Sequence, residues 1–322
     1  MSGVSVIVLT WNGIQLIKEC FPQIVTVTQQ WKIPHELILI DNGSKDGTIS
    51  YVKEMWPEVH AISLEKNRGF SHANNCAARQ AQHDILLFVN NDLVFEGGFI
   101  EPLINHLENE EVFAVAPKIL KWDRKTVDDG LRHGEYHSGL FSVHLEVDKN
   151  RIDLPHWVTF FCGACFLCKK EYFFELGGFD EVYTPYSWED LDLAYRAWKR
   201  GYKIIYEPKA VCYHKREATT KSLFSNFFFI TLIWRNKFLF IWKNITYMPF
   251  ILDHIIHLPW KLIKFLFNGR WRYVCGFFRA IPHIPIIYKK RRAEKKKEMI
   301  TDNEVLARSF HIINNNNSER RI

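Results

Sequence analysis

Short apolar runs that end in polar residues recur in the first two thirds of this chain, and they constrain the fold more than any other feature. The stretch ILLFVNNDLVF begins with five apolar residues from Ile85 and then places Asn90, Asn91 and Asp92 before a second apolar run. Apolar runs of this length are typical of strands that are buried on both faces of a sheet. A buried strand that ends in two amides and a carboxylate predicts a polar site at its carboxyl end.

Segments with helical spacing separate these runs. Besides the stretch just described, the predicted strands cover residues 5–10, 36–44 and 59–67, and the predicted helices cover residues 14–29, 46–56 and 71–82, the last capped by Ser71. This alternation predicts an α/β fold with a largely parallel sheet and helices on both of its faces. Ligands of such sheets bind beyond the carboxyl ends of the strands. We therefore expect Thr10, Asp41 and Asp92 to lie together.

A second group of acids follows in the segment SWEDLDLAYR. It begins with Ser187, a predicted N-cap, and shows helical spacing beyond that residue. Glu189, Asp190 and Asp192 fall in the first turn, where the helix dipole alone favours acids. The cluster is therefore either a helix start or an acid–base site. A further predicted strand ends at His214, which by itself is either a structural histidine or a ligand.

Charge is divided unevenly along the 322 residues. Residues 1–214 hold 21 Lys and Arg against 29 Asp and Glu, a net charge of −8, whereas residues 215–298 hold 18 against 4, a net charge of +14. The basic region is rich in aromatic and aliphatic residues, but its longest uncharged run, Ser222–Trp234, is short of the ~20 residues that a spanning helix needs. We predict amphipathic helices that lie on the surface of an anionic membrane.

These contrasts predict three parts of the chain. Residues 1–214 are predicted to form a catalytic or binding body, residues 215–298 the basic helical region, and residues 299–322 a disordered tail. Nucleic acid is the alternative partner for the basic region, but its dense aliphatic content favours lipid, and we expect no nucleic acid to bind.

The cysteines and the N-terminus indicate a reducing compartment. Seven cysteines without framework spacing are not typical of a disulfide scaffold, and MSGVSVIVLTWNG predicts a strand rather than a secretion signal. Cys162, Cys165 and Cys168 form a C-x-x-C-x-x-C run, which is part of an iron–sulfur pattern. In a strand, however, Cys165 faces away from the other two, which favours small buried residues over a cluster.

Five separated motifs together resemble the family-2 glycosyltransferases of the GT-A fold, whose sheet is mixed and mostly parallel. They are LTWNG, LIDNGSKDGT, EKNRGFSHANN, VNND and SWED, and they occur in the family's order over residues 3–214. The VNND form is most similar to bacterial rhamnosyltransferase-type members. The segment WRNKFLFIWKN also resembles the C-terminal region of membrane-associated members.

The resemblance implies a role for each matching residue. Those that match the donor nucleotide site are Thr10, Trp11, Asn12, Asp41, Asn67, Arg68, Gly69, Asn90 and Asn91. Asp92 keeps the carboxylate of the family's metal motif, and His214 matches the histidine that completes a Mg²⁺ or Mn²⁺ site. Asp190 matches the catalytic base of the ED motif, and Glu189 is expected to orient the acceptor. Asp192 is expected to cap or pack locally.

The implied function is an inverting, metal-dependent transfer of a sugar from a dTDP-, UDP- or GDP-linked donor. The implied acceptor is lipid-linked or a glycan, and the implied place is the cytoplasmic face of the cell membrane, in peripheral contact. Two alternatives remain open. A nucleotidyltransferase needs a Gly-rich basic loop after the first strand, which TWNGIQLIKEC does not supply. A sugar-nucleotide-binding protein without catalysis is the other, and Asp92, Asp190 and His214 argue against it.

Overall fold

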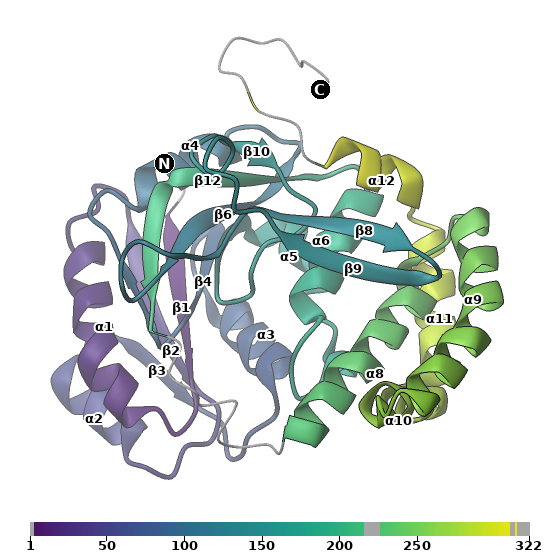
Figure 1. Cartoon of the computed structure of the whole chain (residues 1–322). Helices are drawn as coiled ribbons and strands as arrows, with labels where there is room; N and C mark the ends of the chain where they lie inside the picture. The colour runs from purple at the N-terminus through teal and green to yellow at the C-terminus, as the bar shows by residue number, and fades with distance from the viewer. Residues whose placement is uncertain (1–2, 216–225, 310–312, 314–322) are drawn as a thin grey trace.

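The chain folds around one large mixed sheet and a separate two-stranded ribbon (Figure 1). The computed structural model describes residues 3–215, 226–309 and 313. The strands are β1 (Val4–Thr10), β2 (His35–Asp41), β3 (His60–Ser63), β4 (Ile85–Asn90), β5 (Leu93–Phe95), β6 (Val112–Lys121), β7 (Val127–Asp129), β8 (Arg132–His137), β9 (Leu140–Leu145), β10 (His156–Trp157), β11 (Cys165–Lys169) and β12 (Lys203–His214). The sheet runs in the order β10-β12-β6-β11-β4-β1-β2-β3, with β5 paired to β12 and β7 to β6, whereas β8 and β9 form the ribbon.

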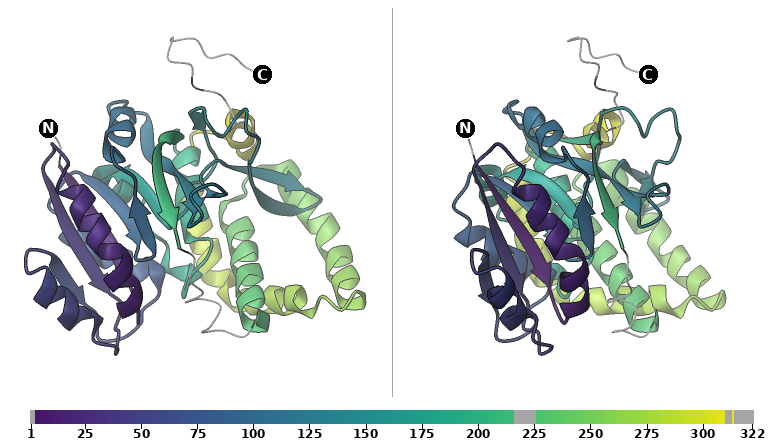
Figure 2. Two further views of the ribbon diagram at one scale, coloured as in Figure 1. Left: turned by 60° about the vertical axis from the view of Figure 1, so that its left-hand side comes forward. Right: turned by 90° about the vertical axis from the view of Figure 1, so that its left-hand side faces the viewer.

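Helices cover both faces of the sheet, as the sequence predicts (Figure 2). They are α1 (Ile14–Thr28), α2 (Thr48–Met55), α3 (Phe70–Gln80), α4 (Ile100–Leu107), α5 (Lys170–Glu175), α6 (Glu189–Lys199), α8 (Asn226–Asn244), α9 (Met248–Phe267), α10 (Trp271–Ala280), α11 (Ile284–Lys295) and α12 (Asp302–Arg308), with short 3₁₀ turns η1 (Glu181–Tyr183) and η2 (Ile281–His283). Helices α1, α2 and α4 share one core with the sheet. Helices α3, α5 and α6 share the other, and α8 joins them.

The central strands are apolar throughout because both of their faces are buried. Along β1, Val4, Val6 and Val8 pack with α1, whereas Ile7 packs on the opposite face. β1 lies parallel to β2 and to β4, so that Thr10 pairs with Asp41 at the end of both strands. The predicted strands around β1, β2 and β4 are therefore confirmed.

β11 runs antiparallel between β4 and β6 and makes the sheet mixed. Cys165 packs in the core on one face of the sheet and Cys168 in the core on the other, as the strand interpretation of the cysteine run predicts for this pair. The prediction is wrong for Cys162, which precedes β11 and packs against the same core as Cys165. None of the seven cysteines, all of which lie within the described residues, forms a disulfide bond.

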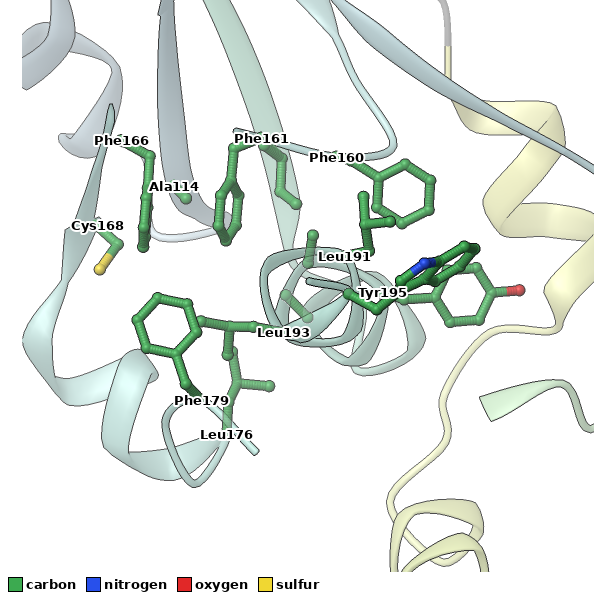
Figure 3. Close-up of a cluster of buried hydrophobic side chains, with 14 of the residues drawn as sticks. Ala114, Phe160, Phe161, Phe166, Cys168, Leu176, Phe179, Leu191, Leu193 and Tyr195 are labelled. Atoms are coloured by element: carbon green, nitrogen blue, oxygen red, sulfur yellow. The ribbon is translucent and has the colours of Figure 1, made fainter. Parts of the chain in front are cut away.

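Helix α6 is buried on nearly every side, because the sheet lies on one side of it and the C-terminal helices lie on the other. Figure 3 shows Leu191, Leu193 and Tyr195 of α6 next to aromatic rings from the segment that leads into β11. Phe160 stacks on Tyr195, and Phe161 stacks on Phe166 with ring centroids 4.0 Å apart. This packing gives the acids at the start of α6 a rigid base.

The basic helical region packs against the catalytic body through buried polar contacts. Lys243 of α8 lies 2.6 Å from Asp180 and 2.8 Å from Asp192, and Asn244 also donates to Asp192. Asp192 is fully buried and also accepts from Arg196 of its own helix. The prediction that Asp192 packs locally holds, although its partners include a distant helix.

The prediction of disorder from residue 299 onward is wrong for residues 302–308. They form α12, which starts with a capping box between Thr301 and Glu304. Asp302 is fully buried and accepts hydrogen bonds from Tyr195 and Lys199, and these contacts fix the segment. Residues 310–312 and 314–322 lie outside the described residues.

Two predicted N-caps are also wrong. Helix α3 begins at Phe70 after Gly69, which has a φ of 86°, and Ser71 lies inside the helix. Helix α6 begins at Glu189 after Trp188, and no side chain caps it. In both cases the residue directly before the helix, Gly69 or Trp188, has a positive φ and occupies the N-cap position. The predicted serine is therefore not the N-cap residue.

No helix among the described residues is both long and apolar enough to cross a membrane.

Candidate active site

The polar strand ends meet at one edge of the sheet, as predicted. Asn91 donates a 2.8 Å hydrogen bond to the hydroxyl of Thr10. Asn90 donates from its backbone nitrogen to Ala164, so the end of β4 is tied to the segment before β11. A Cβ on Gly13 would lie 2.3 Å from the Asn91 amide nitrogen, so a larger residue there would displace the Asn91 side chain from Thr10.

The loop after β2 holds the loop after β1 in place. Asp41 is fully buried, and its carboxylate accepts from the backbone nitrogen and the hydroxyl of Ser44. The Ser44 oxygen accepts from the Asn12 nitrogen at 2.7 Å, and Asn12 accepts from Lys45 at 2.9 Å. Burial raises the pKa of Asp41, although the Ser44 hydrogen bonds act in the opposite direction. Trp11, which precedes Asn12 in the chain, is half-buried.

Asn42 organises the third loop of the predicted donor site. Its side chain accepts from the Arg68 nitrogen at 2.9 Å and donates to Asn67 and to the Gly69 carbonyl. The Arg68 side chain is exposed, so its guanidinium is available to an anionic group. Apart from Asn90 and Asn91 at the end of β4, the predicted donor residues therefore lie at or next to three loops that are tied together by hydrogen bonds.

Asp92 and His214 face each other, although they lie far apart in the sequence. Strand β5 pairs antiparallel with the end of β12, so that Leu93 lies opposite His214. Asp92 Oδ2 lies 3.2 Å from His214 Nε2, and His214 Nδ1 lies 2.7 Å from Asp128 Oδ2. Burial alone would lower the pKa of His214, but the hydrogen bonds to Asp128 and Asp92 outweigh it and raise the pKa to about 9.

The Asp92–His214 pair fits a divalent cation that displaces the Nε2 proton of His214, because a histidine ligand binds metal in its neutral form. Asp92 Oδ1 is buried and has no hydrogen-bond partner among the described residues. Asp128 holds one ring nitrogen of His214 and orients the other, as outer carboxylates do for histidine ligands. The described residues contain no group of three or more His, Cys, Asp and Glu with metal-site geometry. Two protein ligands are nonetheless typical of Mg²⁺ sites that substrate phosphates complete.

Asp190 projects from the first turn of α6 towards the same edge. Its Oδ2 accepts a 2.9 Å hydrogen bond from the backbone nitrogen of Gly163. The next residue, Ala164, has the carbonyl that accepts from the backbone nitrogen of Asn90. Burial raises the pKa of Asp190, whereas the nearby Arg132 and the Gly163 hydrogen bond lower it, and the net shift is upward. A raised pKa makes this carboxylate a stronger base near neutral pH.

Two adjacent acids of β7 contact the two parts of the site, the Asp92–His214 pair and the surroundings of Asp190. Asp128 binds His214, and Asp129 forms an ion pair with Arg132, which in turn lies near Asp190. Neighbouring residues of a strand point to opposite sides, so one short strand reaches both groups. The ion pair with Asp129 keeps the pKa of Arg132 raised despite burial.

Glu189 is buried next to Asp190. Only 5% of Glu189 is exposed, and its Oε2 has no hydrogen-bond partner among the described residues. Burial, and then the charge of Asp190, raise the pKa of Glu189 to about 8. Glu189 is therefore protonated at neutral pH and able to donate a hydrogen bond, which suits the predicted role of orienting an acceptor.

The turn before α6 is strained and is held by α8. Ser187 and Trp188 have φ values of 78° and 77°, a conformation that costs energy for residues other than glycine. Asn236 of α8 is fully buried, and its amide nitrogen lies within 3.0 Å of the carbonyl oxygens of Tyr183, Tyr186 and Ser187. The helix after the catalytic body thus fixes the turn that presents Asp190.

Sequence reasoning missed several residues of this site. Asp128 and Arg132 fall in a segment that looks like a hydrophilic insertion, and only the paired acids of VDDG could have marked them. Asn42 lies inside the motif LIDNGSKDGT but gives no separate signal. Asn236 lies in WRNK, where an asparagine within an apolar helix indicates a buried polar contact.

A family model decides what this arrangement belongs to. Residues 5–177 match the model described as glycosyl transferase family 2. The chain belongs to glycosyl transferase family 2. Residues 142–218 of this family-2 chain also match a model described as the N-terminal domain of galactosyltransferase. The resemblance seen in the motifs is therefore confirmed, and the second match spans the segment from β9 to just beyond His214.

Two curated relatives show how much of the chain is shared. A protein named probable N-acetylgalactosaminyltransferase 9 from Caenorhabditis elegans is 27% identical over 191 residues, which cover 54% of this chain but only 32% of the relative. An N-acetylglucosaminyl-diphospho-decaprenol L-rhamnosyltransferase from Mycobacterium tuberculosis is 27% identical over 213 residues, covering 58% of this chain and 68% of that protein. The chain thus spans about a third of the first relative.

A solved structure supports the fold. The crystal structure of GalNAc-T7 with UDP, GalNAc and Mn²⁺ superposes with a TM-score of 0.60 at 19% identity, over 76% of this chain and 48% of that one. The mixed, mostly parallel sheet flanked by helices is the GT-A fold, as predicted.

Proposed function

We propose that the chain transfers a sugar from a nucleoside diphosphate donor to a hydroxyl of a lipid-linked or polysaccharide acceptor in cell-surface glycan synthesis. One observation carries the proposal. Asp190 accepts from Gly163, and the next residue, Ala164, binds the end of the strand that delivers Asp92. A base and a cation-binding pair therefore lie on either side of one short backbone segment, which is the arrangement that a group transfer from a diphosphate needs.

In the proposed reaction, the acceptor oxygen attacks the anomeric carbon while the bond from that carbon to the diphosphate oxygen breaks. Asp190 takes the proton of the acceptor hydroxyl, and the nucleoside diphosphate leaves with the bonding electron pair. A single displacement of this kind inverts the anomeric configuration. Protonated Glu189 donates a hydrogen bond that orients the acceptor.

Mg²⁺ or Mn²⁺ is the cofactor that we propose, bound by Asp92 and His214. Such an ion offsets the negative charge that builds up on the diphosphate as it leaves. The orphan oxygen of Asp92 and the orientation of His214 by Asp128 support this assignment. The Mn²⁺ named for GalNAc-T7 agrees with it.

The donor would lie over the three tied loops. We propose that its base stacks on Trp11 and contacts the exposed Asn12, while Arg68 meets phosphate. Asp41 is fully buried and holds this loop in place through Ser44 instead of contacting the base itself. The nucleotide is dTDP, UDP or GDP, and the sugar is rhamnose or another hexose. The name of the relative from Mycobacterium tuberculosis supports rhamnose and a lipid diphosphate acceptor.

We propose a peripheral position on the cytoplasmic face of the cell membrane. Helix α9 lies at the outer edge of the molecule (Figure 1) and turns one apolar stripe to solvent. The stripe consists of Leu252, Ile256, Trp260, Ile263 and Phe267, whose exposed fractions run from 46% to 83%. An apolar stripe next to lysines on a region of net charge +14 fits an anionic lipid surface.

The test compares the wild-type chain with Asp190→Asn. A thermal-shift screen of dTDP-, UDP- and GDP-sugars with Mn²⁺ first identifies the donor, because only a bound donor stabilises the fold. Transfer to a lipid-linked acceptor should then fall by about 10²–10⁴-fold in Asp190→Asn, with donor binding unchanged. A near wild-type rate in Asp190→Asn would falsify the base assignment. Donor binding without transfer to any acceptor would favour a binding protein.

A further inference from the structure

An apolar cavity of about 600 Å³ lies within the basic helical region. Its walls come from β8 and from helices α8 to α11, with Ile241, Ile245, Leu258 and Phe277 among the lining residues. The volume is in the range of pockets that hold small molecules, ~300–1,000 Å³. The cavity is separate from the site at the edge of the sheet.

The polar groups in the wall of the cavity are bonded to other protein groups. Tyr136 donates its hydroxyl to the Phe250 carbonyl at 2.6 Å, and Arg291 donates to the Trp242 carbonyl at 2.8 Å. Trp242 donates its indole N–H to His254 Nε2 at 3.0 Å.

His254 donates its other ring nitrogen to the Gly139 carbonyl. Burial lowers its pKa, which agrees with a neutral ring that accepts from Trp242. With its polar groups bonded in this way, the wall presents hydrocarbon to an occupant. The occupant that matches this wall is therefore a hydrocarbon chain, which forms no hydrogen bonds.

The mouth of the cavity joins an exposed apolar and basic surface. Ile255, Ile281 and Ile284 line the cavity, and their exposed fractions are 60%, 38% and 46%. Exposed apolar patches of this kind mark interaction sites. The mouth adjoins helix α11, whose last turns carry a run of lysine and arginine. This charge complements a phosphate on the occupant.

Strand β8 connects the cavity with the catalytic base. Arg132 at the start of β8 lies near Asp190, and Tyr136, four residues further on, lines the cavity. Four residues of a strand span about 13 Å. A sugar and its phosphate linkage bridge a distance of this order, so one molecule can reach both places.

We propose that this cavity binds the hydrocarbon chain of a phosphate-linked lipid acceptor. The proposal rests on the function proposed above and names the part of the acceptor that the helical region recognises. It also explains why a wall lined mainly by apolar side chains opens onto a basic surface.

The test measures binding of radiolabelled farnesyl phosphate to the full chain by equilibrium dialysis. Ile284→Trp places a larger ring at the mouth and should weaken binding at least 10-fold. Ile286→Trp is the matched control, since Ile286 lies on the same helix, has an exposed fraction of 42%, and does not line the cavity. It should bind within twofold of wild type. Ile255→Trp repeats the test from helix α9 in case Ile284→Trp does not fold.

Three outcomes would overturn the proposal. If both mouth variants bind farnesyl phosphate as tightly as the wild type does, the probe binds somewhere other than the cavity. Full competition by inorganic phosphate would show that the chain is not recognised. Equal competition by phosphatidylglycerol would show that the cavity takes bulk membrane lipid instead of an acceptor.

Transfer to a short-chain acceptor, measured on the same proteins, separates this proposal from the proposed function. Absence of this transfer in wild type would count against the transferase itself, whereas its presence without binding of farnesyl phosphate would count against the cavity alone.

Discussion

At the scale of single residues, the position of the catalytic base depends on a glycine. A Cβ on Gly163 would lie 3.2 Å from Asp190 Cβ and 3.3 Å from its Oδ2, tighter than ordinary contact. Asp190 has little room to give way because it also lies near Arg132. We predict that Gly163→Ala lowers kcat about 10-fold, since small misplacement of a reacting group is costly. Steady-state kinetics should show little change in the donor KM.

Gly97→Ala is the matched control, because nothing lies within 4 Å of a Cβ at that position. It should leave kcat unchanged. An unaltered kcat in Gly163→Ala would mean that the base tolerates displacement.

Glu189 predicts a pH dependence of stability. Its pKa is raised from 4.5 to about 8, first by burial and then by the charge of Asp190. Between about pH 4.5 and pH 8 the unfolded state releases a proton that the folded state keeps, so the wild type loses stability as the pH rises through this window. Glu189→Gln has no such proton, so its Tm should fall less steeply from pH 5 to pH 8. Parallel Tm curves for the two proteins would contradict the assignment.

At the scale of elements, helix α8 acts as part of the active site without touching the reacting groups. Asn236 and Asn244 lie eight residues apart on one face, and they bind the turn before α6 and Asp192 of α6 respectively. Asn236 is therefore a positioning residue. Its three carbonyl partners would be left unpaired on truncation, and buried unpaired groups cost about 1–3 kcal/mol each.

We predict that Asn236→Ala lowers kcat about 10-fold or more while donor binding stays close to wild type. Asn75→Ala is the matched control, because Asn75 is also buried and makes two hydrogen bonds to Phe179 rather than to the catalytic turn. Both variants should lose stability, but only Asn236→Ala should lose kcat when assayed below both unfolding midpoints. Equal loss of kcat in both would reduce Asn236 to a purely structural role.

Elements with local signals could be predicted from the sequence, and long-range pairings could not. Strands β1, β2 and β4 are apolar runs, and their shared edge follows from the rule for parallel sheets. Asp128 reaches His214 across 86 positions only because β7 pairs with β6 and β6 with β12. No local pattern encodes that path. The caps of α3 and α6 were missed for a related reason, since contacts made elsewhere in the fold set their entry turns.

At the scale of the whole molecule, an acidic body and a basic helical region form one packed unit. Lys243 and Asn244 connect them through buried contacts with Asp180 and Asp192. The position of the helical region therefore also sets where the catalytic edge lies relative to any surface that α9 contacts. In the membrane arrangement proposed above, these buried contacts would couple membrane binding to catalysis.

This coupling makes vesicle binding a test of the whole arrangement. The triple variant Ile256→Asp, Trp260→Asp, Phe267→Asp removes three side chains whose burial in lipid is worth about 1.5–3 kcal/mol each. We predict that binding to phosphatidylglycerol vesicles in sedimentation assays falls more than 100-fold. Because the three residues are 69%, 67% and 83% exposed, the fold and the transfer to a short-chain acceptor should be retained.

The matched control replaces three exposed apolar residues of the catalytic body, Met55→Asp, Val147→Asp and Phe174→Asp. It adds the same negative charge and should sediment with vesicles as the wild type does. Equal loss in both triple variants would assign vesicle binding to net charge alone, because the added negative charge is the change that the two variants share. Unchanged sedimentation of the α9 variant would show that this stripe faces something other than lipid. A selective loss in the α9 variant is the result that places the stripe on the membrane and fixes the orientation of the catalytic edge above it.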